Sequence, residues 1–442
     1  MSRWWFSSVI CVLVISLTVP CITAQDQPIW TAKGLVYPEG ASIPAYLTDV
    51  EREYLLANPP LYEPQRFAPP TGTIYCVPEY APMEGLLMSW ESYTDVLTTM
   101  SVGITTGDPA AKVFMVVDST SEQNSVYSTL FNAGCNMDRV EFLVRVTDTV
   151  WIRDYGPRYI YEDGRRAIID HNYNRPRPND NAFNDWLAPH WGEAQYDIPL
   201  THGGGNFHLF ANGDAFMTTL ILNENPGMTE QQIKDVYAQY QNVNLTIYPG
   251  FPTSFDSTQH IDMWMLAVDD FKVIIGQYSS SAGQPYTITE NAAADLTSRG
   301  YTVYRTPGWN SSGTHYTYTN AVILNNQVFV PRFGGSSASQ DNQAKAVFEQ
   351  ACPGKTVIQV NCASIIQAAG AMHCIVMHVP TPTPPCPGDL DGDNDVDIAD
   401  LAVLLAHYGE TGASPNDGDL DHDGDVDVAD LAALLAVYGV VC

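Results

Sequence analysis

Gly370-Ala371-Met372-His373-Cys374-Ile375-Val376-Met377 is the stretch around which the large domain of this chain is predicted to be organised. Two small residues and a methionine precede a His-Cys pair, and the apolar run that follows is typical of a buried strand. A cysteine at the head of a strand can be held by rigid backbone while its sulfur faces a cavity. Neighbouring side chains of an extended segment point to opposite faces, so we expect that His373 is not the base that acts on Cys374.

Residues 1–24 are predicted to be a signal peptide. Met1-Ser2-Arg3 is basic, Val9 to Val19 is an apolar core, and Thr23-Ala24 offers a small-residue cleavage site. The core is too short to span a membrane, and no later apolar run is long enough to do so. We therefore expect a mature chain that begins near Gln25 and is secreted or otherwise extracytoplasmic, where a cell-surface complex could hold it.

The composition indicates a globular protein with a large core, because 45% of the residues are hydrophobic and only 16% are charged. The chain carries 20 Lys and Arg against 50 Asp and Glu, a net charge of -30. This charge argues against nucleic acid as a partner and favours cationic substrates or partners. It is unevenly spread, since residues 386–442 hold 14 acidic residues and no Lys or Arg.

The number of cysteines is odd once the signal peptide is removed, which in an oxidising compartment leaves one thiol free or intermolecular. Cys386 and Cys442 bracket the tail and could pair, and Cys352 is close enough to Cys362 to pair with it. Cys374 is then a candidate for the free thiol, although sequence alone does not fix the pairing. The seven remaining cysteines are Cys76, Cys135, Cys352, Cys362, Cys374, Cys386 and Cys442.

The chain divides into a lead-in, a large domain, a linker and a tail. Residues 25–75 are rich in Pro, Tyr and Ala and predict an extended lead-in with one helix over residues 47–57. Residues 76–380 alternate short apolar strands with amphipathic helical stretches such as 229–240, an α/β pattern. Residues 381–387 form a stiff proline-rich linker. The predicted strands are Gly85–Trp90, Val113–Val117, Glu141–Arg145, Val273–Ile275, Val328–Pro331 and Thr356–Val360.

The tail is an internal repeat, because the segment 388–401 recurs as 418–431 and each copy runs into an apolar helix that ends in Tyr-Gly. Calcium needs several oxygen ligands around a tight loop, and aspartates occupy the ligand positions of both copies. The sixth loop position is Gly424 in one copy and Asn394 in the other, residues that tolerate the left-handed turn. The predicted ligands are Asp389, Asp391, Asp393, Asp395, Asp397 and Asp400, and Asp419, Asp421, Asp423, Asp425, Asp427 and Asp430.

This tandem resembles a dockerin module over residues 388–442. The resemblance implies a small all-α domain with calcium in its two loops, and docking to a cohesin-type protein. A dockerin normally travels with a catalytic or binding domain, so the tail indicates where the protein is held and leaves its activity open.

Four polar motifs precede Cys374 in the large domain. They are Trp151-Ile152-Arg153-Asp154-Tyr155-Gly156-Pro157, Gly203-Gly204-Gly205-Asn206-Phe207, His260-Ile261-Asp262 and Tyr318-Thr319-Asn320-Ala321. An extended segment would place the two polar side chains of the third motif on one face. In this order, with Cys374 last, the motifs resemble the guanidine-modifying pentein superfamily, and within it the agmatine deiminases and bacterial peptidylarginine deiminases, over residues 76–378.

The resemblance implies a five-bladed α/β propeller with the site on its axis, and hydrolysis of a guanidine without a cofactor. Two carboxylates grip the planar guanidinium, Cys374 attacks its carbon, and His260 acts as general acid and then as general base. Asn320 orients the nucleophile, and Trp151 stacks on the substrate. The gripping carboxylates are those of Asp154 and Asp262.

The choice of substrate depends on a proline-rich segment that follows Asp154. The segment Asn172-Tyr173-Asn174-Arg175-Pro176-Arg177-Pro178 resembles the stretch in which bacterial peptidylarginine deiminases hold a peptide C-terminus. We therefore predict conversion of C-terminal arginine to citrulline, with Arg177, helped by Arg175, binding the carboxylate. Ala369-Gly370-Ala371-Met372 replaces the glycine run usual in agmatine deiminases. Agmatine (giving N-carbamoylputrescine), free arginine, an amine acceptor instead of water, or a non-catalytic binding module remain alternatives.

Overall fold

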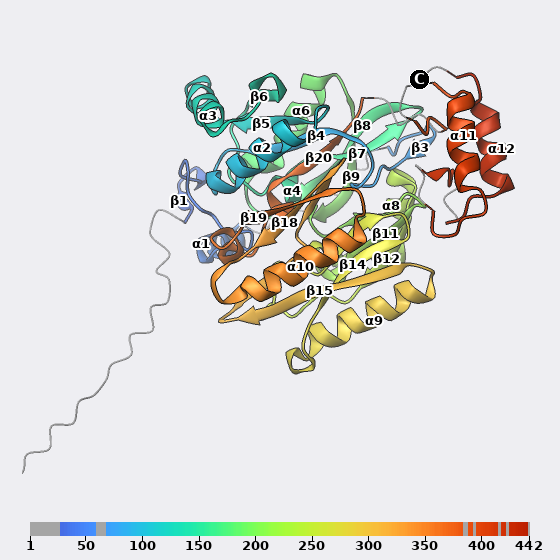
Figure 1. Ribbon diagram of the computed structural model, residues 1–442. Helices are drawn as coiled ribbons and strands as arrows, with labels where there is room; N and C mark the ends of the chain where they lie inside the picture. Colours follow the sequence, from blue (N-terminus) through green and yellow to red (C-terminus); the bar gives the residue numbers. More distant parts are fainter. Residues whose placement is uncertain are drawn as a thin grey trace, which may run out of the picture.

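The computed structural model describes residues 27–58, 68–382, 388–391, 395–413, 417–420 and 424–440 (Figure 1). The predicted signal peptide and the predicted Cys386–Cys442 pair lie outside these residues. Among the residues that are described, no helix has the length and apolar character needed to cross a membrane.

Residues 68–382 form five sheets of three or four strands, and one ββαβ unit recurs in all of them. Each unit has two antiparallel strands, then a helix, then a strand parallel to the second strand. This recurrence explains the alternation of strands and helices in the sequence. The predicted strands and the helix over 229–240 are confirmed to within a few residues at their ends.

The first three units follow one another along the chain. The first unit has β7 (Arg158–Glu162), β8 (Arg165–Tyr173), α5 (Pro178–Asn181), α6 (Phe183–Trp191) and β9 (Ala194–His202), and β3 (Ile74–Tyr75) joins its sheet. The second has β10 (His208–Leu209), β11 (Asp214–Thr218), α7 (Leu220–Glu224), α8 (Glu230–Gln241) and β12 (Asn244–Tyr248). The third has β13 (Met265–Asp269), β14 (Lys272–Gln277), α9 (Gln284–Ser298), β15 (Thr302–Ser311) and β16 (Thr314–Thr317).

The last two units bring the ends of the domain together. The fourth has β17 (Val322–Leu324), β18 (Gln327–Arg332), α10 (Ala338–Ala351) and β19 (Thr356–Asn361). The fifth joins β20 (Met377–Pro380) to β4 (Met83–Ser89), α2 (Thr94–Gly107), β5 (Lys112–Val117), α3 (Thr120–Ala133) and β6 (Val140–Val144). Five sheets and a closing strand pair are what a five-bladed propeller requires, and the arrangement about a common axis stays a prediction.

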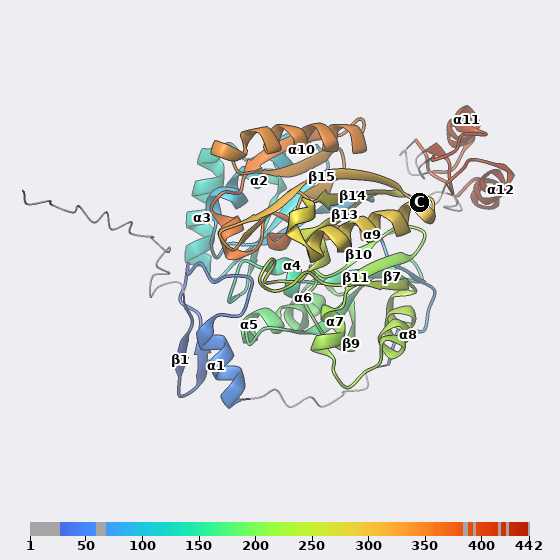
Figure 2. The ribbon, with the colours of Figure 1, turned by 90° about the horizontal axis from the view of Figure 1, so that it is seen from below.

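The strand pair β20–β4 joins segments almost 300 residues apart, with Met377 opposite Leu87 and Val379 opposite Gly85. Gly85 is required there by space, because a Cβ atom would lie 2.2 Å from the carbonyl oxygen of Lys112. Strands such as β5 are buried on both faces and therefore read as continuous apolar runs. Helices α9 and α10 cover the third and fourth sheets on the outside (Figures 1 and 2).

The N-terminal lead-in contains the predicted helix over residues 47–57, which is confirmed as α1, and its described residues 27–58 also form a hairpin that the sequence did not predict. It contains the hairpin β1 (Ile29–Thr31) and β2 (Gly34–Val36) and helix α1 (Asp49–Ala57). A capping box between Thr48 and Glu51 fixes the start of α1. Between hairpin and helix, residues 41–45 are largely buried against the large domain, and the Ala45 N–H donates to the Ala368 carbonyl at 3.0 Å. We call residues 41–51 the N-terminal strap.

The C-terminal repeat folds as two helices, α11 (Ile398–His407) and α12 (Val428–Val437), which lie side by side in both views (Figures 1 and 2). Asp397 and Asp427 cap the two helices in the same way, as the repeat predicts. Leu404 and Leu434 pack with Val396 and Val426 in a small common core. The described part of the repeat thus contains two helices with matching caps, and the calcium-binding dockerin domain stays a prediction.

The five cysteines of the described chain, Cys76, Cys135, Cys352, Cys362 and Cys374, are free and buried. The predicted pairing of Cys352 with Cys362 is therefore wrong. Cys352 ends helix α10 and Cys362 follows strand β19, and each packs into the main core as an apolar side chain. An unpaired state consequently does not distinguish Cys374 from the other four.

Candidate active site

The predicted catalytic residues share one position in the fold, since each lies directly before the first strand of a ββαβ unit. Asp154 lies in α4 (Ile152–Tyr155), and the others lie in loops or single 3-10 turns. Hydrogen bonds between these segments show that they meet, since Asn320 donates to Asp262 and Cys374, and Gly205 donates to Asp154. The residues and the strands that follow them are Asp154 before β7, Gly205 before β10, His260 and Asp262 before β13, Asn320 before β17, and Cys374 before β20.

Asn320 holds the candidate nucleophile. Its Nδ2 donates to Cys374 Sγ at 3.1 Å and to Asp262 Oδ2 at 3.0 Å. Its Oδ1 accepts from the Ala371 N–H at 3.0 Å and from the Cys374 N–H at 3.4 Å. One amide side chain therefore fixes both the backbone and the sulfur of Cys374, in agreement with the orienting role predicted for it.

His260 lies beside the two predicted guanidinium ligands. Its Nδ1 is 3.5 Å from Asp154 Oδ1, which also accepts from the Gly205 N–H at 3.1 Å. A Cβ atom at Gly205 would lie 2.8 Å from His260 Nδ1 and 3.0 Å from both Asp154 Oδ1 and Asp262 Oδ2. Gly205 is thus required for space between these three groups.

Several buried polar atoms around this space have no hydrogen-bond partner among the described residues. They include His260 Nε2, Asp262 Oδ1, Asn174 Oδ1 and Glu224 Oε2. Buried polar atoms are normally paired, so a cluster of unsatisfied ones indicates a site that a polar ligand completes. The set contains carboxylates and a histidine nitrogen, which suit a ligand rich in N–H donors.

Burial raises the pKa of the Cys374 thiol well above its usual range, and the charges of Asp262 and Asp154 raise it further. A guanidinium placed between the same two carboxylates would neutralise them, so a bound cation favours the thiolate that an empty site disfavours.

The third motif is not extended, in contrast to the prediction. Residues Ile261–Met263 form a single 3-10 turn, and β13 begins only at Met265. His373–Ile375 is a second such turn. His260 and Asp262 still face the same site because the turn is short. The prediction that His373 is not the base for Cys374 agrees with its contacts, because its Nδ1 forms a hydrogen bond with Asp262 Oδ2 at 2.9 Å.

The predicted substrate contacts are covered by the N-terminal strap. The indole N–H of Trp151 donates to the Ile43 carbonyl at 2.8 Å, and the ring is buried beside Gly370. Arg175 Nε donates to the Ala45 carbonyl at 3.0 Å. Trp151 consequently forms part of the wall next to Cys374, and stacking on a substrate remains a prediction.

Arg177 differs most from its predicted role. Its guanidinium is fully buried, pairs with Glu51 at 2.9 Å and donates to the Pro44 carbonyl at 2.7 Å. Tyr37 also donates to the Glu51 carboxylate, at 2.9 Å. In this structure the carboxylate that Arg177 binds therefore belongs to the chain itself, and Arg177 is not available to clamp the carboxylate of a substrate.

Three residues near the site were missed from sequence. Asn174 and Glu224 are hydrogen-bonded to each other, and burial raises the pKa of Glu224 to about 7 despite the nearby charge of Arg175. Glu79, in the segment before β4, accepts from Arg153 and from His373. A glutamate beside a proline or at the end of a short helix carries no distinctive sequence signal, so only the fold identifies Glu79 and Glu224. The fold also brings Asn174 to the site, through its hydrogen bond with Glu224.

The C-terminal loops hold oxygen ligands at a spacing that fits calcium. The carboxylates of Asp389, Asp391 and Asp400 have oxygens within 4.8 Å of one another, as do those of Asp395, Asp397 and Asp400, and of Asp425, Asp427 and Asp430. Two oxygens on one calcium ion lie at most about 5 Å apart, since each bond is 2.3–2.6 Å long. The predicted ligands Asp393, Asp421 and Asp423 lie outside the described residues.

Comparison with known proteins gives a consistent result for residues 75–380, which match the profile of the Porphyromonas-type peptidyl-arginine deiminases. A Marinomonas protein provisionally named an agmatine deiminase is 24% identical over 352 residues, covering 68% of this chain and 93% of the relative. A Legionella pneumophila protein with the same provisional name is 25% identical over 343 residues, covering 71% and 97%.

Solved structures resemble the fold over the same region. A variant of the C. jejuni agmatine deiminase with substrate bound superimposes with a TM-score of 0.62 at 19% identity, covering 72% of this chain and 100% of that one. The agmatine deiminase of Enterococcus faecalis gives 0.59 at 18% identity, with coverages of 72% and 96%. These likenesses establish a pentein-type α/β deiminase fold.

Proposed function

The chain belongs to the Porphyromonas-type peptidyl-arginine deiminase family, and we propose that its large domain hydrolyses the guanidine of agmatine to N-carbamoylputrescine and ammonia through a covalent intermediate on Cys374. The observation that carries this proposal is the set of buried, unsatisfied polar atoms near Gly203 and Gly205. A planar guanidinium carries N–H donors along all its edges and would supply the missing partners.

The reaction begins when Asp154 and Asp262 bind opposite edges of the guanidinium and the bound charge favours the Cys374 thiolate. The sulfur attacks the guanidine carbon and forms a C–S bond. His260, whose Nε2 is buried without a hydrogen-bond partner among the described residues, takes up the thiol proton and gives it to the departing nitrogen. Ammonia then leaves, and a thiouronium remains on the enzyme. His260 then removes a proton from water, whose oxygen attacks the same carbon and releases the ureido product and the thiol. No step needs a cofactor.

Agmatine is favoured over a C-terminal arginine for three reasons. Arg177 is paired with Glu51 and would have to break a fully buried ion pair in order to bind a substrate carboxylate. Relatives that span two thirds of the chain carry the name agmatine deiminase. Glu224, with one oxygen unsatisfied, offers an acceptor for a cationic tail.

Peptidylarginine is the second candidate, and Arg175 favours it. This residue is only partly buried and interacts electrostatically with Glu224, so the chain does place one cation beside the site. A substrate carboxylate could displace Glu224 from Arg175 without disturbing Arg177. The name of the matching family also points to this substrate.

The deciding experiment compares agmatine, a peptide that ends in arginine, and the C-terminal amide of that peptide, with ammonia release and formation of the ureido group as readouts. We expect the highest kcat/KM for agmatine. Preference for the free-acid peptide over its amide would support the second candidate, and absence of ureido product from all three would contradict both.

The tail has a separate role in this proposal. We propose that the C-terminal helix pair binds calcium in its two loops and docks the enzyme to a cohesin-type partner outside the cytoplasm. The support is the repeated arrangement of aspartates, caps and core leucines in the two halves. Binding of calcium by the full chain, followed by capture on an immobilised cohesin, tests it.

A further inference from the structure

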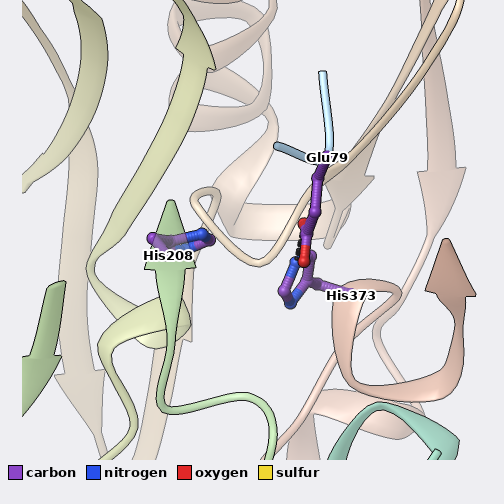
Figure 3. A group of neighbouring side chains, drawn as sticks. All are labelled: Glu79, His208 and His373. Atoms are coloured by element: carbon purple, nitrogen blue, oxygen red, sulfur yellow. Dashed lines mark hydrogen bonds and ion pairs between the residues drawn. The ribbon is translucent and has the colours of Figure 1, made fainter. Parts of the chain in front are cut away.

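A chain of charged groups runs from Asp262 through His373 and Glu79 to Arg153, and all of them except Glu79, which is 21% exposed, are buried. His373 bridges two carboxylates, with Nδ1 at 2.9 Å from Asp262 Oδ2 and Nε2 at 2.7 Å from Glu79 Oε2. Figure 3 shows the Glu79 carboxylate directed at the His373 ring. Glu79 is in turn ion-paired with Arg153. The mechanism above uses Asp262 but none of the other three residues.

These groups could also be read as a metal site, because Glu79, His208 and His373 each have a ligand atom within 4.8 Å of the other two. Two observations argue against a metal there. Two ligands of a tetrahedral zinc lie about 3.3 Å apart, given Zn–N bonds of 2.0–2.1 Å, whereas 2.7 Å between Glu79 and His373 is a hydrogen-bond length. The Arg153 guanidinium already supplies a positive charge to Glu79.

The hydrogen bonds decide how the two oxygens of Asp262 are used. Oδ2 accepts from His373 and from Asn320 and lies 3.6 Å from Cys374 Sγ, whereas Oδ1 is buried without a partner in the described chain. Oδ2 thus accepts from the Cys374 thiol as well as from His373 and Asn320. The free oxygen is left for the substrate.

We propose that Glu79 and His373 are positioning residues of the deiminase, which together keep Asp262 ionised and hold its Oδ1 toward the guanidinium. The inference rests on the proposed function for its substrate. It does not depend on which guanidine that substrate is.

The charge balance of the surroundings agrees with this role. Burial and Arg153 lower the pKa of His373, but Glu79 and Asp262 outweigh them and the net pKa is raised. Burial raises the pKa of Asp262, but His373, together with His260 and His208, outweighs it and the net pKa is lowered. The other titratable or charged groups around this pair are Asp154, His208, His260, Cys374 and His378.

The test uses two variants of the chain and one matched control. Glu79→Gln keeps the shape of the side chain but removes the charge that stabilises the imidazolium. His373→Asn keeps a donor near the position of Nδ1 but can carry no charge. His208→Gln is the control, because His208 donates to the Met265 carbonyl, and burial lowers its pKa to about 4, so the substitution leaves the charge unchanged.

In both test variants Asp262 loses its cationic partner and its pKa rises, so the acidic limb of the kcat/KM profile should move upward by about one pH unit. One unit corresponds to about a tenfold loss at pH values below that limb. His208→Gln should retain the wild-type profile. The profile is measured with whichever guanidine the wild type turns over, so failure of agmatine as a substrate would count against the proposed function alone.

Two results would overturn the inference. The first is an acidic limb that stays at the wild-type pH in folded Glu79→Gln enzyme. The second is stoichiometric zinc in the dialysed wild type that is lost, with activity, in His208→Gln, which would make the cluster a metal site. If neither test variant folds, 15N NMR of wild-type histidines decides, because the proposal requires His373 to be protonated at both ring nitrogens at pH 7.

Discussion

The large domain and the C-terminal helix pair both bury acidic side chains, but they compensate the charges differently. Side-chain cations neutralise three carboxylates of the large domain and of the strap packed on it: Glu51 pairs with Arg177, Glu79 with Arg153, and Asp262 with His373. In the helix pair the buried Asp400 and Asp430 accept instead from backbone N–H groups, such as those of Leu390 and Leu420.

The difference follows from composition, because residues 386–442 contain no Lys or Arg. Backbone N–H groups supply hydrogen bonds but no net charge, so the remaining negative charge of the loops needs a cation from solution. Several carboxylates of the large domain, such as those of Glu79 and Glu193, already have side-chain cations as partners. We therefore predict that the stability of the C-terminal helix pair depends on bound metal and that the stability of the large domain does not.

Cys374→Ala gives the largest expected effect and separates the two regions most clearly. Loss of the only group that can form the covalent intermediate should lower kcat by at least about 10⁴-fold, while calcium binding by the tail is unchanged. Ammonia release and calorimetry measure the two. The matched control is Cys352→Ala, since Cys352 is also free and buried but should retain turnover; normal turnover by Cys374→Ala would refute the assignment.

Breaking the Glu51–Arg177 ion pair tests how strongly the stability of the large domain depends on neutralising buried charges with partners from its own chain. Both side chains are fully buried, so Arg177→Met alone should lower the free energy of unfolding by about 3–5 kcal/mol, whereas Glu51→Met with Arg177→Met should restore most of it. Urea unfolding measures both. A single variant as stable as the wild type would show that the strap does not hold Arg177 in solution.

The same pair predicts a pH dependence. Burial raises the pKa of Glu51, but Arg177 and the Thr48 N–H outweigh it, and the net pKa is lowered. A folded pKa below the unfolded one means that the contribution is present above the unfolded pKa of glutamate and is lost as the pH falls through the folded value. The gap in stability between wild type and the double Met variant, followed by urea unfolding at a series of pH values, should therefore shrink in acid.

Removal of calcium should act on the tail alone. At a calcium concentration 100 times the dissociation constant, binding stabilises the bound unit by about 2.7 kcal/mol, so chelation should lower the melting temperature of the helix pair and leave kcat/KM of the deiminase unchanged. Calorimetry of the full chain should count about two ions. Asp400→Asn and Asp430→Asn should each remove one, and absence of uptake at millimolar calcium would end the dockerin interpretation.

The smallest change in the free energy of unfolding is expected for an exposed ion pair. This pair tests whether the cost of losing a partner comes from burial of the charges or from the ion pair itself. Lys345 and Glu349 are one turn apart on α10, 2.8 Å from each other and about half exposed. Glu349→Gln should change the free energy of unfolding by only about 0.3–0.5 kcal/mol, measured by urea unfolding. A loss of unfolding free energy as large as that of Arg177→Met would mean that the size of the loss depends on ion pairing and not on burial.

Local patterns predicted much of this molecule. The α/β alternation identified the strands and helix α8, and the repeat at 388–401 and 418–431 identified the two capped helices. The ordered motifs gave the five residues that the fold brings together, because each lies next to a strand end, where a short motif is enough to mark it. Patterns failed for Cys352 with Cys362, since closeness in sequence is not closeness in space.

What sequence alone determined is therefore the kind of unit and the chemistry of the residues at its ends. What only the tertiary structure decided is which partner each charged group meets: Arg177 with Glu51 of the strap, His373 between Asp262 and Glu79. The physical reason is that a strand or a capped helix depends on neighbours within a few residues, whereas the energy of a buried charge depends on groups brought in from distant parts of the chain. An arginine that seemed suited to a substrate is, for that reason, held by the protein itself.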